Sequence, residues 1–166
     1  MSLNRDIELL RQSPLLAGFS SEQLRLLAFG AENVMLREGR VLFHENQLAD
    51  SAYVIATGQI MLDRDDHGEK IDLGIYGTGC MLGETALLVE TRRPARALAH
   101  SASEVIKVRR SLFRRMLQEY PDMARVLHQH MVQRFAKTAQ DLSHIGDQLG
   151  RIQPDIDVDI DKFISK

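Results

Sequence analysis

Apolar positions along the chain follow two different periods, and the changes between them divide the sequence into three regions. In residues 1–32, apolar side chains recur at three- and four-residue steps in two runs separated by Ser13-Pro14, which predicts two short helices. In residues 33–110, short apolar runs alternate with turn residues such as Gly, Asp and Asn at intervals of about ten residues. This second pattern predicts the antiparallel strands of a sandwich or barrel.

Helical spacing returns in residues 111–152. A short amphipathic helix is predicted to stop at Tyr120-Pro121, and the proline then suits the first turn of a second helix. The apolar stripe of this second helix continues to about Ile152, so the helix would be on the order of 45 Å long at 1.5 Å per residue. Such a helix extends beyond a barrel of this size, and a second copy of the chain is the simplest cover for its outer half. The pattern therefore predicts a homodimer formed through the long helix.

The last residues, 153–166, alternate aspartate with apolar side chains from Asp155 to Asp161. The alternation is typical of a strand, but aspartates along one side favour a solvated edge strand or a loose acidic tail. Calcium is not expected there, because Ile160 stands where an EF-hand loop requires glycine.

Composition narrows the class of protein without naming a function. The chain has 166 residues, of which 44% are hydrophobic and 27% are charged, as in an ordinary globular domain. The formal net charge is −2, from 21 basic and 23 acidic residues, so we expect no DNA partner. No apolar run is long enough for a membrane span, and the single cysteine, Cys80, cannot form an intramolecular disulfide. We therefore predict a cytoplasmic protein without a membrane partner.

The candidate chemistry lies in residues 82–97. Gly83 opens a short segment that is compatible with a helix, and the N–H groups at a helix start attract an anion, especially a phosphate. Glu84 adds a carboxylate that could accept hydrogen bonds from a pair of sugar hydroxyls. Arg93 follows on the same segment and could donate as a fork to phosphate oxygens. These residues suit a sugar-phosphate site, and the alternative is a Glu84–Arg93 salt bridge that closes a turn.

Eight residues of this segment match a longer pattern. They are Leu82, Gly83, Glu84, Ala86, Leu87, Arg93, Ala95 and Ala97. Together they resemble the phosphate-binding cassette of the cyclic nucleotide-binding domain family, and the likeness extends over about residues 5–145. It implies an α+β fold, in which an antiparallel double-stranded β-helix (a β-roll) of about eight strands carries N-terminal helices and a long C-terminal helix.

The resemblance also assigns a part to each region of the chain. Residues 1–32 would form the N-terminal helices, and residues 33–110 the β-roll, with the cassette at residues 82–97. Residues 111–152 would form C-terminal helices that act as a lid and as a dimer contact. The acidic tail, residues 153–166, would follow them.

The family's pattern implies a role for individual residues. Glu84 would bind the ribose 2′-hydroxyl, and Arg93 would bind the cyclic phosphate together with the backbone of Gly83–Thr85. On the long helix, Thr138 falls where a threonine of the bacterial activators reads the exocyclic amine of adenine, so cAMP is favoured over cGMP as the ligand. The remaining ligand-binding positions are Leu82, Thr85, Pro94, Ala95 and Arg96.

Two departures from the family's pattern bear on binding. Pro94 has no N–H, although the family uses the N–H of this position to contact the phosphate. Losing one charge-assisted hydrogen bond costs about 1.5–3 kcal/mol, or about one to two decades of affinity. Arg96 brings bulk and charge that argue against a cGMP-selective pocket, and it would either add a second phosphate contact or obstruct the ligand.

These observations predict a regulatory module that binds a cyclic nucleotide and passes its occupancy to the C-terminal helices and to an unidentified protein partner. The alternative, which both departures favour, is a dimeric interaction scaffold whose nucleotide site no longer binds. We expect no enzyme, no catalytic residues, no metal site and no cofactor, because the sequence shows no clustered nucleophile and base and no metal-ligand set. The pairs Arg109-Arg110 and Arg114-Arg115 are interpreted as a solvated helix face.

Overall fold

A computed structural model describes residues 2–149, so the predicted acidic tail at 153–166 lies outside the described residues. The helices in this range are α1 (Leu3–Gln12), α2 (Ser21–Gly30), α3 (Thr85–Leu88), α4 (Arg110–Glu119) and α5 (Pro121–Leu149). The strands are β1 (Glu32–Leu36), β2 (Val41–Phe43), β3 (Leu48–Ala49), β4 (Ser51–Thr57), β5 (Ile60–Asp66), β6 (Glu69–Tyr76), β7 (Met81–Leu82), β8 (Thr91–Arg92), β9 (Arg96–Ala99) and β10 (Ser103–Arg109).

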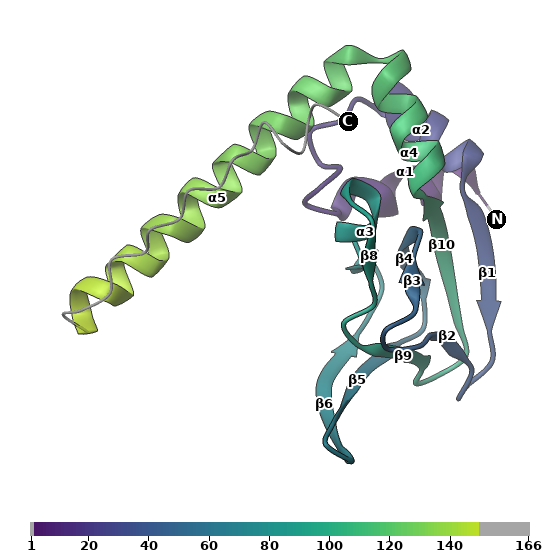
Figure 1. The fold of residues 1–166 in the computed structure, drawn as a ribbon. Coiled ribbons are helices and arrows are strands. Elements are labelled where there is room, and N and C mark those ends of the chain that lie inside the picture. The colour runs from purple at the N-terminus through teal and green to yellow at the C-terminus, as the bar shows by residue number, and fades with distance from the viewer. Residues whose placement is uncertain (1, 150–166) are drawn as a thin grey trace.

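Most of the strands form two antiparallel sheets that face each other. One four-stranded sheet has the order β1-β10-β4-β7, the other has the order β2-β9-β5-β6, and β3 pairs separately with β8. Strands far apart in the sequence are neighbours, so that Ile55 of β4 lies opposite Val105 of β10. This is the β-roll that the sequence predicts, with two helices before it and two after it (Figure 1).

The sheet β1-β10-β4-β7 separates two apolar cores, and β4 contributes to both. Val54 belongs to a helical core that packs α1, α2, α4 and the start of α5 against one face of the sheet. Ile55, the next residue, belongs to an inter-sheet core between the two sheets, because successive side chains of a strand point to opposite faces. The cassette segment lies at the border of these cores, with Leu82 in the inter-sheet core and Leu87 of α3 in the helical core.

The helix α2 begins with a complete capping box formed by Ser20 and Gln23. The backbone N–H of Gln23 donates to the Ser20 hydroxyl at 3.2 Å, and the backbone N–H of Ser20 donates to the Gln23 side chain at 2.9 Å. These two bonds satisfy N–H groups that the first turn of a helix would otherwise leave without partners.

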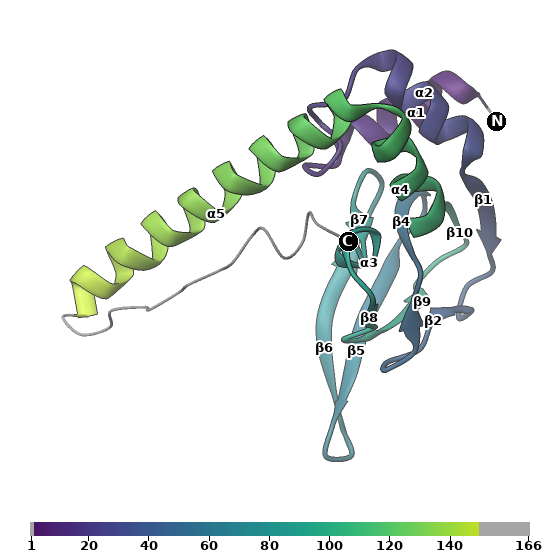
Figure 2. The ribbon, with the colours of Figure 1, turned by 45° about the horizontal axis from the view of Figure 1, so that its top comes forward.

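The helix α5 begins at Pro121, as the sequence predicts, and extends far from the β-roll. Its first turns pack into the helical core, where Met123 and Leu127 are buried. The rest of the helix projects away from the sheets in both views (Figures 1 and 2). Its 29 residues span about 44 Å at 1.5 Å per residue, which agrees with the predicted length.

Candidate ligand-binding site

The cassette begins with a tight backbone turn at Gly83, between β7 and α3. Gly83 has a φ of +73°, in the region that other residues rarely adopt. A Cβ atom at this position would collide with Nη1 of Arg93. Glycine therefore allows the Arg93 guanidinium to lie directly against the backbone that leads into α3.

Arg93 lies between β8 and β9, and its side chain carries most of the site's chemistry. The residue is only 3% exposed. Its Nη2 donates a hydrogen bond to the carbonyl oxygen of Ser51 at 2.7 Å. Its Nε and Nη1 are also buried, but they have no hydrogen-bond partner in the described part of the structure. Because each unpartnered buried donor costs about 1–3 kcal/mol, this guanidinium is poorly satisfied without an anion.

Two aromatic rings of the inter-sheet core contact the same guanidinium. Its Cζ lies 4.3 Å from the ring centroid of Phe43 and 5.4 Å from that of Tyr53, and the two rings stack on each other. These cation–π contacts replace part of the lost hydration, although burial still lowers the pKa of the Arg93 guanidinium. We call Phe43, Tyr53 and the Ser51 carbonyl the Arg93 cradle.

The backbone of Arg93 is also held in place. Its N–H donates to the carbonyl oxygen of Gln47, and its own carbonyl accepts from the N–H of Asn46, both at 2.8 Å. Both partners lie in the turn between β2 and β3. The side chain and the backbone of Arg93 are therefore positioned by strands from the first half of the β-roll.

The other cassette residues that the motif names differ in burial. Leu82 is buried in the inter-sheet core, and Glu84 is half-buried immediately before α3. Thr85, the first residue of α3, is exposed. Beyond the arginine, Pro94 is exposed and Ala95 is buried. Their contacts with a ligand stay predictions.

Arg96 forms a cross-strand ion pair with Asp63. Its Nε donates to Oδ1 of Asp63 at 2.8 Å, and its Nη2 contacts Oδ2. The two residues lie opposite each other on β9 and β5. Their strand neighbours Ala97 and Leu62 face the inter-sheet core, so the pair lies on the other face of the sheet. This pairing disfavours the second phosphate contact predicted for Arg96.

Thr138, the residue predicted to read the base, lies on α5. Its side chain is outside the part of the chain that the structure describes. Its role therefore stays a prediction.

Sequence reasoning missed the residues that support the site from a distance. The cradle comes from β2 and β4, and Ser51 is 42 positions before Arg93 in the sequence. The apolar run of β4 could have placed Tyr53 in a core, but no pattern links it to the arginine. Arg110, interpreted as part of a solvated helix face, instead donates to three backbone carbonyls.

These features are suited to an anion. A fixed, buried guanidinium with two unbonded nitrogens lies against a glycine backbone at the entrance to α3. Such a fork suits the oxygens of a phosphate. A carboxylate, that of Glu84, lies at the start of the same segment.

Comparison with known proteins agrees with this geometry. The model of the cyclic nucleotide-binding domain family matches residues 33–120, which is more than half of the chain. The chain belongs to the cyclic nucleotide-binding domain family. The match includes the whole cassette and the Arg93 cradle of this cyclic nucleotide-binding domain.

Solved structures confirm the fold of the domain. A cyclic nucleotide-binding-like protein from Brucella abortus is 47% identical, with a TM-score of 0.64, over 68% of this chain and 97% of that one. The N-terminal domain of a transcriptional regulator from Streptomyces coelicolor is 27% identical, with a TM-score of 0.76, over 81% and 94%. The Thermus thermophilus catabolite activator protein is 25% identical, with a TM-score of 0.64, over 80% and 63%.

Curated relatives include much longer enzymes. A lysophospholipase from Neosartorya fischeri is 30% identical over 116 residues, which is 69% of this chain and 8% of the relative. One from Chaetomium globosum is 33% identical over 97 residues, which is 57% of this chain and 6% of the relative. The chain thus corresponds to a small part of these proteins.

Residues 2–149 contain no helix that is long and apolar enough to cross a membrane. In the same range, no three His, Cys, Asp or Glu side chains gather in a way that could hold a metal ion.

Proposed function

We propose that this domain is a regulatory sensor that binds cAMP and passes its occupancy to the C-terminal helices. The observation that carries the proposal is Arg93, a buried guanidinium with two unbonded nitrogens. A cyclic phosphate would supply the missing acceptors with a charge of the right sign. Without such a ligand, one carbonyl and two ring faces are the described contacts that offset the cost of burying this cation.

The other contacts follow from the cassette. The backbone of Gly83–Thr85 would donate to the phosphate, and the Glu84 carboxylate would accept from the ribose 2′-hydroxyl. The preference for cAMP over cGMP depends on Thr138, whose hydroxyl could accept from the adenine amine. The exposed Pro94 would weaken the phosphate contact without removing it, because Arg93 keeps its two donors.

We propose a homodimer formed through α5. The first turns of this helix are buried in the helical core, but the remainder projects from the β-roll (Figure 2). A second copy would cover the projecting part and place two sensors beside a shared helical pair. An output through a further protein partner and a cytoplasmic location, which the single cysteine favours, belong to the same proposal.

We further propose that the role is regulatory and not catalytic. The side chains of the cassette suit the binding of an anion and a sugar, and the proposed contacts leave the ligand unchanged. The lysophospholipases are 6–8% covered by this chain, so their activity is not transferred to it.

Thermal unfolding of nucleotide-stripped protein tests the proposed ligand. At one hundred times the dissociation constant, cAMP should stabilise the protein by about 2.7 kcal/mol, which raises Tm by several degrees. Arg93→Ala should abolish this shift, whereas Arg92→Ala, which changes the exposed neighbour, should preserve it. A smaller shift with cGMP would support the preference for cAMP. No shift with either nucleotide at millimolar concentration would contradict the proposal and favour the scaffold.

Light scattering tests the dimer independently of the ligand. At micromolar concentration, the mass should be twice the 18.8 kDa of one chain. A monomer mass would contradict the dimer and leave the ligand proposal standing.

A further inference from the structure

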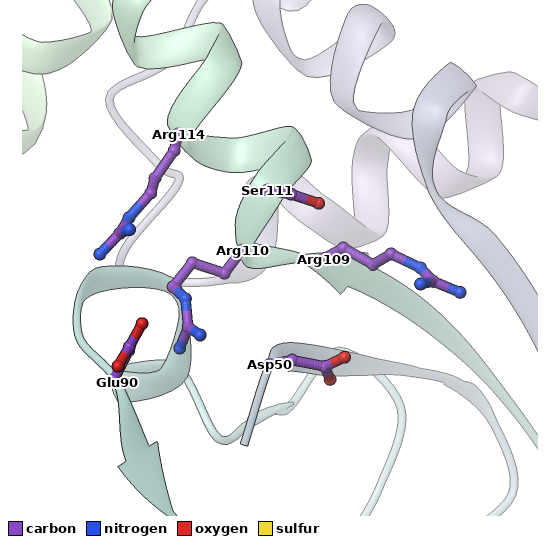
Figure 3. Close-up of a pocket in the computed structure, with 6 residues that line it drawn as sticks. All are labelled: Asp50, Glu90, Arg109, Arg110, Ser111 and Arg114. Carbon is purple, nitrogen blue, oxygen red and sulfur yellow. The ribbon is translucent and has the colours of Figure 1, made fainter. Parts of the chain in front are cut away.

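The junction between the cassette helix α3 and the C-terminal helix α4 contains a polar pocket. The pocket has a volume of about 410 Å³ and is lined by Asp50, Glu90, Arg109, Arg110, Ser111 and Arg114. Figure 3 shows that Arg110 extends from the start of α4 toward the loop that carries Glu90, whereas Arg109 points away from it. Arg109 is instead paired with Glu32, with Nε to Oε1 at 2.6 Å.

Arg110 connects two separate segments through its side chain and a third through its backbone. Its Nη1 donates to the carbonyl oxygens of Ala86 and Val89 at 3.2 and 3.1 Å, and to that of Ala49 at 3.0 Å. Its backbone N–H donates to the carbonyl oxygen of Asp50 at 2.8 Å. Arg110 thus joins three places: Ala49 in β3, Asp50 just before β4, and the last turn of α3, where it contacts Ala86 and Val89.

The contacts with the Ala86 and Val89 carbonyls stabilise the C-terminal end of α3. The helix has only four residues, Thr85–Leu88, so it has few hydrogen bonds of its own. It has no basic residue in its last turn, where a cation would stabilise the negative end of the helix. Arg110 supplies that cation from another element, so the position of α3 depends on the first residue of α4.

The other end of α3 is the proposed phosphate site. Gly83 and Glu84 precede the helix, and the Arg93 guanidinium packs against Gly83. α3 therefore has the ligand residues at its start and the Arg110 contact at its end. A displacement of α3 by a ligand must either move Arg110 or break its hydrogen bonds.

We propose that Arg110 is a positioning residue that holds the cassette helix and couples it to the C-terminal helices. Arg110 occupies the first position of α4, and α4 packs against α5 in the helical core. The coupling route therefore runs from Arg93 and Gly83 through α3 to Arg110, and then into α4. The coupling part rests on the proposed cAMP function, whereas the positioning part is a property of the unliganded protein.

Amide hydrogen exchange of the unliganded protein tests the positioning part. In Arg110→Met, the amides of residues 85–90 should exchange about tenfold faster, because α3 loses a charged partner at two carbonyls. Arg114→Met is the matched control, because it removes an arginine one turn later that lines the same pocket. Arg110→Lys should restore part of the protection. Equal exchange of residues 85–90 in all four proteins would overturn the proposal.

The same experiment with saturating cAMP tests the coupling part. In the wild-type protein and in Arg114→Met, cAMP should slow exchange both in the cassette and in α4. In Arg110→Met, it should slow exchange in the cassette only, a split that general destabilisation would not produce. Slowing in α4 of Arg110→Met equal to the wild type would overturn the coupling. If cAMP changed nothing in the wild type, the sensor function and the coupling would fail, but faster exchange of residues 85–90 in Arg110→Met would still establish the positioning role.

Discussion

Two arginines of the cassette, three positions apart, have opposite environments. Arg96 lies on the outer face of β9 and shares two contacts with the Asp63 carboxylate. Arg93 faces the interior, where one carbonyl and two aromatic rings are its partners and two of its nitrogens have no hydrogen-bond partner among the described residues. The comparison separates an arginine whose charge is balanced by a carboxylate, Arg96, from the arginine of the proposed binding site, Arg93, whose described partners are one carbonyl and two rings.

The largest effects are expected when either arginine is replaced by methionine in a single variant. Arg93→Met should abolish cAMP binding and yet raise the Tm of the unliganded protein by about 2–4 °C, because an apolar side chain suits the cradle better than an unbalanced cation does. Arg96→Met should lower the Tm and preserve binding. Calorimetric unfolding and titration of both variants measure the two effects. A fall in the unliganded Tm of Arg93→Met would contradict the distinction.

The Asp63–Arg96 pair should also have a distinct dependence on pH. Hydrogen bonding to Arg96 holds the pKa of Asp63 below its usual value. A carboxyl with a lowered pKa in the folded state stabilises the fold above its unfolded pKa of about 3.9, and this stability is lost as pH falls through the folded value. Arg96→Met should therefore reduce the free energy of unfolding by about 2 kcal/mol near pH 7.

Measurements at acidic pH separate the contribution of the ion pair from that of packing. Urea unfolding at a series of pH values should show the gap between the wild type and Arg96→Met narrowing below about pH 4, because the carboxyl is protonated first in the unfolded chain and, at lower pH, in the folded protein. A gap that is constant from pH 7 to pH 3 would mean that lost packing, and not the ion pair, destabilises the variant. Arg92→Met, which changes an exposed residue, should show no gap of this size.

Pro94 lies between the two arginines and gives the next largest effect. Pro94→Ala restores an N–H next to the phosphate position and should tighten cAMP binding about tenfold. The same change should reduce stability by about 0.4–1 kcal/mol, because proline restricts the unfolded chain. Isothermal titration measures the affinity, and thermal unfolding without nucleotide measures the stability. An unchanged affinity would show that this N–H does not face the phosphate.

The cassette and the fold were predictable because their signals are local. Gly83, Glu84 and Arg93 lie in one short segment, and their types and spacing are sufficient to indicate an anion site. The change from helical spacing to short apolar runs near residue 33 likewise marks where the strands begin, at Glu32.

The partners of these residues were not predictable because they depend on which strands pair. Asp63 is 33 positions from Arg96 and becomes its neighbour only through the register of β5 and β9. Arg110 was misinterpreted because a charged residue at the start of a helix usually faces solvent, and nothing in the sequence shows that α3 ends beside it. Local patterns therefore indicate the groups of the proposed site, and tertiary pairing determines which charges are balanced.

The cradle should give the smallest effect, and it tests why Arg93 tolerates burial. Phe43→Leu preserves an apolar side chain but removes the nearer π face, 4.3 Å from Cζ of Arg93. Losing about 0.5–1 kcal/mol of cation–π stabilisation should lower cAMP affinity roughly two- to fivefold as the guanidinium loses its fixed position. Tyr53→Phe keeps the ring face and should change the affinity less than about twofold. Titrations at a temperature where both variants are folded separate this effect from stability. If both variants bound cAMP as the wild type does, the Ser51 carbonyl and the Arg93 backbone would be sufficient to position the arginine, and the rings would serve the inter-sheet core alone.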